Sequence, residues 1–355
     1  MKIRSIVASC EDLQLIRPYT IAYKTVTAVE NVVVKVELEN GIIGLGTANP
    51  SKYVVGSDTA DTLRALQPEL LAPFQGKDIR EFYSLLQQVH QLFRQEAGAA
   101  AALDIALHDA FTCWLGVPLV SFLGQAAAGL PTSITIGIRN VVDTLAEARE
   151  YIDRGFRIIK VKLGHSAEDD VERLVKLREA FGDAIVIRVD ANQGYTANEL
   201  LKFYRKTLSL SLELIEQPMP ANAIEEMKQL PPEIKKLVAA DESLVSPANA
   251  FQLADGPAAC GIYNIKLMKC GGIQPAREIA TIARHAGIEL MWGCNDESIV
   301  SISAALHAAL ASPATRYLDL DGSFDLARDI VSGGFTVKDG YMSLTGQPGL
   351  GVRVL

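Results

Sequence analysis

The second part of the chain repeats one unit, a short β-prone run followed by a helical pattern. The starts of these runs lie 24 to 29 residues apart along the sequence. Parallel strands need long connections that are usually helices, so the repeat predicts βα units. Eight evenly spaced units favour a closed (β/α)8-type barrel over the alternative, an open doubly wound sheet. The predicted strands are 132–138, 157–163, 184–190, 212–216, 237–241, 261–266, 288–293 and 317–321.

The first part of the chain has a different pattern. Apolar runs at 32–38 and 42–45 flank Asn40-Gly41, which is a strong signal for a β-hairpin because both residues accept positive φ. Residues 58–125 then read as helix. Strands followed by helices, rather than alternating with them, indicate an α+β unit.

These two patterns divide the chain. We expect an α+β unit over residues 1–125 and a barrel over 126–322. The last segment, 323–355, contains further turns and short strands, and we expect it to return to the first unit. A chain of 355 residues is expected to form one large domain and one smaller domain.

Composition and charge exclude several classes of protein. The net charge is −8, so no basic footprint for nucleic acid is present. No apolar run is long enough to predict a membrane span, and the first residues do not resemble a signal peptide. The five cysteines form no C-x-x-C pair, which argues against a zinc site or a disulfide framework. We therefore expect a cytoplasmic protein that binds neither nucleic acid nor membrane.

Polar residues, most of them charged, end every predicted barrel strand. In such barrels the active site lies at the carboxyl ends of the strands. A buried charge is costly unless it is paired or binds a metal, so a purely structural barrel would not need this pattern. In strand order the residues are Thr135, then Lys160 and Lys162, then Asp190, Glu216, Asp241 and Lys266, then Asn295-Asp296-Glu297, and last Asp319 and Asp321.

The strand count places these residues in space. Strands two and six are opposite each other in a ring of eight, so Lys162 and Lys266 should face each other across the barrel mouth. Asp190, Glu216 and Asp241 fill the arc between them. Three carboxylates without a histidine form an all-oxygen site that suits one Mg²⁺ per subunit.

This arrangement predicts a reaction. Lys160 and Lys162 are two residues apart and share a face of their strand. We expect the metal and neighbouring cations to lower the pKa of each inward lysine, which makes a neutral amine available as a general base. One base would remove the proton α to a carboxylate, the metal would stabilise the enediolate, and the second base would return a proton to the opposite face. The product is a racemised or epimerised acid.

Less specific interpretations apply to single residues. One Asp or Lys at a strand end is more often a solvated loop residue, but six charged residues in this order are hard to obtain by chance. The pair Asp319 and Asp321 could instead cap a helix or hold a loop. A barrel that only binds or scaffolds is the remaining alternative, and no sequence feature supports it.

Five motifs resemble those of the enolase superfamily, in the muconate-lactonizing-enzyme subgroup, over essentially the whole chain. The resemblance implies a (β/α)7β TIM-like barrel and an α+β capping domain formed by the N-terminal region and the C-terminal tail. It also implies Mg²⁺ on Asp190, Glu216 and Asp241, Lys162 and Lys266 as bases with Lys160 in support, and Asn192 and Glu242 behind them. The motifs are Lys160-Val161-Lys162, the segments 190–194, 216–218 and 240–243, and the segment 264–272.

Within this subgroup, Asp319-Leu320-Asp321 resembles the acidic pair of the dipeptide epimerases. There the pair receives the terminal ammonium of the substrate, a charge-assisted contact. The resemblance implies an isomerase that epimerises the C-terminal residue of a dipeptide, with Thr135 also near the substrate. An N-acylamino-acid racemase or a cycloisomerase of the same subgroup is the alternative. We also expect a homo-oligomer.

The preferred side chain of the dipeptide is less constrained. Lys24 matches a capping-loop position where Ala-Glu epimerases place a cation, which favours an L-Ala-D/L-Glu epimerase. Asp296 lies at a position that is often apolar in the family, and a carboxylate there could receive a cationic side chain or pair with Lys24. We favour a cationic or other non-Glu side chain.

Overall fold

The computed structural model describes residues 1–21, 24–164 and 166–355, without the side chains of residues 17–26. Eight strands form one parallel sheet in the order β12-β11-β10-β9-β8-β7-β6-β5. Thr132, just before β5, bridges Leu318 of β12, so the two edges of the sheet meet. This closure confirms the barrel and excludes the open sheet. The strands are β5 (Ile134–Ile136), β6 (Ile158–Lys162), β7 (Val186–Asp190), β8 (Leu214–Glu216), β9 (Val238–Ala240), β10 (Ile262–Ile265), β11 (Glu289–Gly293) and β12 (Thr315–Asp319).

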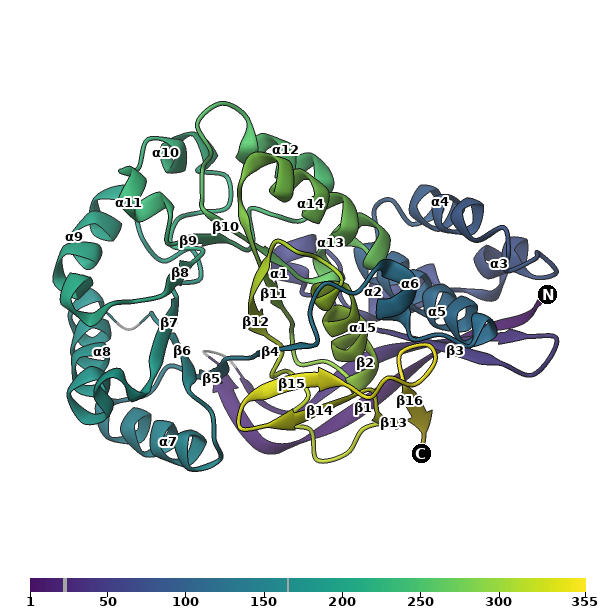
Figure 1. The fold of residues 1–355 in the computed structure, drawn as a ribbon, viewed down its shortest axis with the longest axis horizontal. Helices are drawn as coiled ribbons and strands as arrows, with labels where there is room; N and C mark the ends of the chain where they lie inside the picture. The colour runs from purple at the N-terminus through teal and green to yellow at the C-terminus, as the bar shows by residue number, and fades with distance from the viewer. Residues whose placement is uncertain (22–23, 165) are drawn as a thin grey trace.

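Helices follow these strands and surround the barrel (Figure 1). Local signals start several of them. Thr196 and Glu199 form a capping box at the start of α9, and Ser166 caps α8 by accepting from the Asp169 N–H. The helices are α7 (Val141–Asp153), α8 (Ala167–Phe181), α9 (Ala197–Thr207), α10 (Ile224–Lys228), α11 (Pro232–Lys235), α12 (Pro247–Ala254), α13 (Leu267–Cys270), α14 (Ile273–Ala286) and α15 (Ile299–Leu310), with short 3-10 turns at Gly182–Ala184 and Leu208–Leu210.

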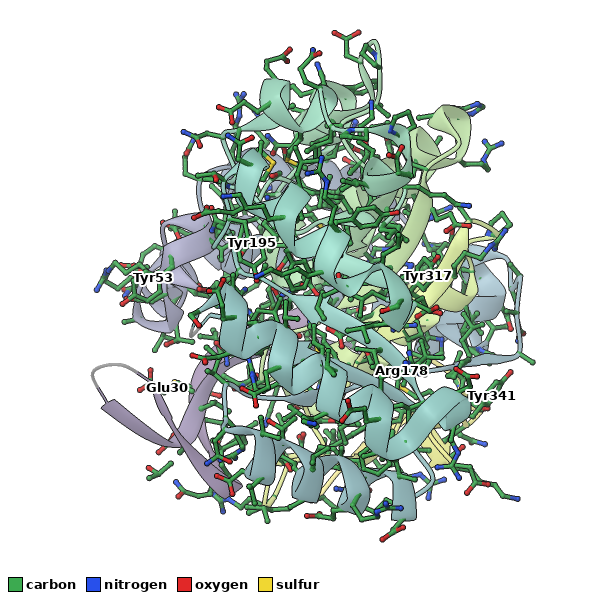
Figure 2. The ribbon with its side chains drawn as sticks, turned by 90° about the vertical axis from the view of Figure 1, so that its left-hand side faces the viewer. Glu30, Tyr53, Arg178, Tyr195, Tyr317 and Tyr341 are labelled. Atoms are coloured by element: carbon green, nitrogen blue, oxygen red, sulfur yellow. The ribbon has the colours of Figure 1, made fainter. Side chains whose placement is uncertain are left out.

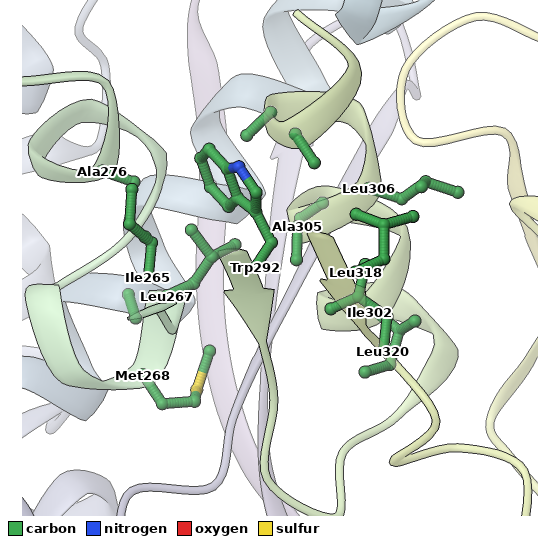
Figure 3. Close-up of a cluster of buried hydrophobic side chains, with 14 of the residues drawn as sticks. Ile265, Leu267, Met268, Ala276, Trp292, Ile302, Ala305, Leu306, Leu318 and Leu320 are labelled. Carbon is green, nitrogen blue, oxygen red and sulfur yellow. The ribbon is translucent and has the colours of Figure 1, made fainter. Parts of the chain in front are cut away.

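The core between the last strands and helices is apolar. Trp292 of β11 is fully buried and lies between Ala276 of α14 and Ala305 of α15 (Figure 3). Its indole N–H donates to Thr315 Oγ1 at 2.9 Å, which satisfies its polar atom. Helix α15 is buried along most of its length, in keeping with its apolar sequence.

The N-terminal unit is a three-stranded antiparallel sheet, β1-β2-β3, followed by helices. The predicted hairpin is confirmed: Glu37 pairs with Ile43, and Gly41 takes a φ of 84° in the turn. The alanine-rich helix α5 packs closely on β3, where a Cβ at Gly46 would collide with the backbone of Ala102. The elements are β1 (Ile3–Ile21), β2 (Lys24–Leu38), β3 (Ile43–Ala48), α1 (Lys52–Val55), α2 (Thr59–Ala65), α3 (Pro68–Leu71), a 3-10 turn (Ala72–Phe74), α4 (Phe82–Leu92), α5 (Ala97–Leu115) and α6 (Leu119–Leu123).

The C-terminal segment contacts both other parts of the chain. Leu326 bridges Leu15 of β1, and the Leu350 N–H donates to Asp109 of α5 at 2.8 Å. Strand β15 also pairs with β4, just before the barrel. The exact domain boundaries stay a prediction. The elements are β4 (Gly129–Pro131), β13 (Val331–Gly333), β14 (Phe335–Lys338), β15 (Tyr341–Leu344) and β16 (Val352–Val354).

These contacts leave different elements at the two ends of the barrel. Figure 2 shows Tyr53 of α1 on one side, and Tyr317 of β12 and Tyr341 of β15 on the opposite side. The segment after β3 lies at the carboxyl end of β11, because Asn49 donates to the Asp296 carbonyl in the loop that follows this strand. Among the described residues, no helix combines the length and the apolar character that crossing a bilayer requires.

Candidate active site

A row of buried carboxylates lies at the carboxyl ends of three neighbouring strands. Asp190 and Glu216 end β7 and β8 and are directly paired in the sheet register. Asp241 follows the last residue of β9. All three side chains are almost completely buried. Parallel strands thus bring together residues that are far apart in the sequence.

Lysines lie at both ends of this row. Lys162 ends β6, and its Nζ lies 2.6 Å from Asp190 Oδ2. Lys266 follows β10, and its Nζ lies 2.9 Å from Asp241 Oδ2. Strands β6 and β10 are four positions apart in the sheet order. The two lysines therefore contact opposite ends of the carboxylate row, as the strand count indicated.

Lys160 lies deeper in the barrel and bridges several carboxylates. Its Nζ is 2.7 Å from Glu216 Oε2 and 2.6 Å from Asp319 Oδ2, and Asp190 Oδ2 is 3.6 Å away. The side chain is almost completely buried. This ammonium therefore joins the carboxylate row to the last barrel strand.

The carboxylates set the pKa of two lysines. Burial lowers the pKa of Lys160, but the charges of Asp319, Glu216 and Asp190 raise it well above its ordinary value. Burial likewise lowers the pKa of Lys266, and Asp241 and Glu216 together raise it above the ordinary value. Here the nearest charges to each ammonium are carboxylates in direct contact, whereas the expected lowering of both pKa values refers to the site with its metal and stays a prediction.

The negative charges of the three carboxylates in this row repel one another. Burial, followed by repulsion from Asp190, raises the pKa of Glu216 to about 8, and Asp241 adds to this. Burial raises the pKa of Asp190 and of Asp241, but the lysines in contact with each carboxylate together outweigh it and lower both values; these are Lys162 and Lys160 for Asp190, and Lys266 and Lys269 for Asp241. The three carboxylates thus lie close enough to repel one another.

This donor set fits a hard divalent cation. Three buried carboxylates supply the oxygen ligands that Mg²⁺ prefers, and their mutual repulsion would be relieved by a cation. Within residues 1–21, 24–164 and 166–355, however, no three acidic, histidine or cysteine side chains form a complete metal site. The lysine ammonium groups bind the carboxylates instead. A cation would therefore have to displace these ammonium groups.

Asp319 and Asp321 differ in their surroundings. Asp319 is buried, and its Oδ1 accepts from Ser133 Oγ at 2.6 Å while Oδ2 contacts Lys160. Asp321 is half-buried and accepts from the Thr135 N–H at 2.7 Å. Burial and the nearby charge of Asp319 raise the pKa of Asp321 to about 7. Of this pair, Asp321 is the more exposed carboxylate.

The two residues considered for side-chain selection lie on different parts of the chain. Asp296 is half-buried in the loop between β11 and α15, and its carbonyl accepts from Asn49 Nδ2 at 2.7 Å. The side chain of Lys24 lies outside the described side chains, so its distance from Asp296 is not defined.

Asn192 and Glu242 lie beside the lysine and carboxylate row. Asn192 Oδ1 accepts from Lys162 Nζ at 3.1 Å, and its Nδ2 donates to Glu242 Oε1 at 3.4 Å. Asn192 has a φ of 42°, a conformation that asparagine tolerates better than most residues. These contacts orient Lys162 from the side of β7.

Three residues that the sequence reasoning left without a role belong to this site. Lys269 Nζ contacts Asp241 Oδ1 and donates to the Asn264 carbonyl at 3.0 Å, and the side chain is buried. Asn264 Nδ2 donates to Glu216 Oε1 at 2.9 Å. Gln217 Oε1 accepts from the Asp241 N–H at 2.8 Å. All three lie within the motifs quoted above. The one signal available in the sequence was that Asn264 lies two residues before Lys266, so both side chains point to the same face of the strand.

Matches to family models identify the class of this barrel. Residues 4–124 match the model described as mandelate racemase / muconate lactonizing enzyme, N-terminal domain, and residues 143–355 match the model described as enolase C-terminal domain-like. Together they span most of the chain. The chain belongs to the mandelate racemase / muconate lactonizing enzyme family of the enolase superfamily.

Individual relatives narrow the comparison to epimerases. The chain is 55% identical to an L-Lys-D/L-Arg epimerase of Desulforapulum autotrophicum, with 99% of both chains covered. A dipeptide epimerase from Methylococcus capsulatus, crystallised with Mg and the dipeptide L-Arg-D-Lys, matches at a TM-score of 0.97 and 51% identity over 100% of both chains. The L-Ala-D/L-Glu epimerase from Bacillus subtilis matches at 0.93 and 31%, over 99% of both.

Proposed function

We propose that this protein is an Mg²⁺-dependent dipeptide epimerase that inverts the α-carbon of a cationic C-terminal residue. The observation that carries the proposal is the placement of Lys162 and Lys266 at opposite ends of one buried carboxylate row. A substrate α-carbon between them would be open to a base on either face. The relatives that act on Lys-Arg dipeptides, similar over nearly the full length, support the cationic side chain.

The lysines perform the proton transfer. One of Lys162 and Lys266 removes the α-proton, and the other supplies a proton to the opposite face, so the configuration inverts. Lys160 holds a buried positive charge that stabilises the negative charge developing on the substrate carboxylate. Asn192 keeps Lys162 oriented through its 3.1 Å hydrogen bond.

Asp190, Glu216 and Asp241 would hold the Mg²⁺ ion. A bound ion would neutralise these carboxylates, which would lower the pKa of Lys160 and Lys266, and it would supply positive charge for the substrate carboxylate. Asn264 and Lys269 orient Glu216 and Asp241 from behind, as hydrogen-bonding partners of metal ligands commonly do.

Two acidic residues would recognise the rest of the dipeptide. Asp321, half-buried beside Thr135, receives the terminal ammonium of the substrate. Asp296, in the loop after β11, receives the cationic side chain of the C-terminal residue. Asp319 supports the site through Lys160.

The direct test is α-proton exchange. The protein would be incubated in D₂O with Mg²⁺ and a library of L-Lys-L-Xaa and L-Ala-L-Xaa dipeptides, and products would be analysed by mass spectrometry and chiral chromatography. We expect deuterium at the α-carbon of the C-terminal residue, fastest when that residue is Arg or Lys. No exchange with any dipeptide would reject the proposal.

Two further expectations accompany the function. We infer a homo-oligomer, to be tested by light scattering coupled to size-exclusion chromatography. We also infer a cytoplasmic location, to be tested by fractionation of the source cells.

A further inference from the structure

The loop between β11 and α15 is fastened to the N-terminal unit by two reciprocal hydrogen bonds. Asn49, which follows β3, donates from Nδ2 to the Asp296 carbonyl at 2.7 Å. Asn295 donates from its own Nδ2 to the Asn49 carbonyl at 2.8 Å. Each bond runs from a side chain to a backbone carbonyl, and they run in opposite directions. We call the pair Asn49 and Asn295 the asparagine latch.

The same loop is held on its other side. The Ser298 N–H donates to Asn31 Oδ1 of β2 at 3.2 Å, and Glu297 Oε1 accepts from the Asn295 N–H at 2.7 Å. Residues of the N-terminal unit therefore hold the loop backbone at Asp296 and again at Ser298. Because its own carbonyl and the preceding side chain are both held, the direction of its Cα–Cβ bond is constrained.

Asn49 also contacts helix α13 of the barrel. Its backbone N–H donates to Met268 Sδ at 3.3 Å, two residues beyond Lys266. One residue of the N-terminal unit thus contacts the helix α13 that directly follows a proposed base, and the loop of the proposed selectivity residue. This contact uses the backbone, so it is independent of the Asn49 side chain.

A simpler interpretation is that the latch only satisfies polar groups. Asn49 and Asn295 are half-buried rather than buried, so water could satisfy their amides at little cost. The reciprocal pairing is therefore not forced by burial. What the direct bonds add over water is a fixed position for the loop.

We propose that Asn49 and Asn295 are positioning residues for substrate selection, because they hold the Asp296 carboxylate where it meets a cationic C-terminal side chain. This inference rests on the proposed function of the barrel. It assigns to the N-terminal unit a part in selecting the substrate through a barrel loop.

The test compares a cationic dipeptide with a neutral one of the same shape. Asn49→Ala, Asn295→Ala and the double variant would be assayed with L-Lys-L-Arg and L-Lys-L-citrulline, and Asn198→Ala, an exposed change in α9, is the matched control. We expect kcat/KM for L-Lys-L-Arg to fall about tenfold in each single variant, mainly through KM. The value for L-Lys-L-citrulline should change less than about twofold, as should both values in the control. The double variant should lose little more than either single variant, because both bonds serve one loop position.

The outcomes separate the latch from the function. If the wild-type protein exchanges no dipeptide α-proton, the proposed function fails and the variants are not needed. If the wild type is active but each variant loses activity on both substrates by the same factor, the ratio of the two kcat/KM values is unchanged and the latch does not act in selection. Thermal unfolding of each variant, compared with the control, shows whether a uniform loss comes from a weakened fold.

Discussion

The ammonium of Lys160 lies 2.6 Å from Asp319 Oδ2, across the seam where the first and last barrel strands meet. Ser133, directly before the first of these strands, donates to the other oxygen of Asp319 at 2.6 Å. Both groups are almost completely buried, so this ion pair belongs to the framework of the site. Within the part of the chain whose side chains are described, the neighbouring Asp321 forms no ion pair, and it is half-buried.

This difference predicts separate effects for the two aspartates. Asp321→Asn keeps an oxygen for the Thr135 N–H but loses the charge that attracts an ammonium, so kcat/KM for L-Lys-L-Arg should fall roughly 30-fold. An N-acetylated dipeptide, which lacks the ammonium, should react at the same rate with the variant and the wild type. Asp319→Asn should lose both activities, because it leaves Lys160 underpaired. Equal losses for both substrates in Asp321→Asn would contradict this division.

Binding of Mg²⁺ should be visible without any substrate. A ligand that binds only the native state stabilises it, by about 2.7 kcal/mol at a hundred times its Kd. We therefore expect Mg²⁺ to raise the Tm of the wild type. Burial and Asp190 raise the pKa of Glu216 to about 8, so Glu216→Gln removes little charge at neutral pH and should fold, but without the Mg²⁺ response. Glu225→Gln, an exposed change, is the control. A Tm shift that survives in Glu216→Gln would remove that residue from the metal site.

Lys269 should matter for stability as well as for Asp241. Its buried ammonium contacts Asp241 and the Asn264 carbonyl, and breaking a buried ion pair by removing one partner costs about 3–5 kcal/mol. Lys269→Met should lower the free energy of unfolding by this amount in urea titrations. Lys176→Met removes an exposed ion pair with Glu179 and should leave the free energy of unfolding nearly unchanged. Similar costs for the two variants would show that Lys269 is not structurally important.

The stability of the fold should fall in mild acid through His307. Burial lowers the pKa of this histidine to about 4, and its Nδ1 accepts from the Val120 N–H at 2.9 Å. The unfolded chain binds this proton below its ordinary pKa of about 6.5, whereas the folded chain does not, so stability is lost as the pH falls from that value towards 4. Between pH 7 and pH 5 this one group should account for about 2 kcal/mol.

The measurement is the pH dependence of urea unfolding. His307→Gln should lose less stability between pH 7 and pH 5 than the wild type, whatever its stability at pH 7. His285→Gln, at an exposed position, should keep the wild-type pH dependence. An unchanged slope in His307→Gln would show that this histidine is not held neutral by the fold.

Much of this architecture could be predicted from the sequence. Charged residues such as Asp190 and Glu216 mark where a strand ends and which of its faces points into the barrel. The order of the βα units then places these residues around the ring. The hairpin at Asn40-Gly41 was predictable because its turn requires positive φ. These features depend on local patterns and on counting.

The electrostatic details could not be predicted in this way. Which carboxylate each ammonium contacts depends on side-chain conformations, so the pairing of Lys269 with Asp241 and of Lys160 with Asp319 was not visible. The rise in the pKa of Lys160 and Lys266 that these contacts cause was not predictable for the same reason. The latch between Asn49 and Asn295 joins distant loops that carry no recognisable pattern.

The central claim is that Lys162 and Lys266 act on opposite faces of one α-carbon. The most direct measurement is α-proton exchange in D₂O by Lys162→Ala and Lys266→Ala, each with L-Lys-L-Arg and with L-Lys-D-Arg, followed by NMR and chiral analysis. We expect each variant to exchange the proton of one epimer only, without inversion, and the two variants to act on opposite epimers. Exchange of the same epimer by both variants, or continued epimerisation by either one, would contradict the account.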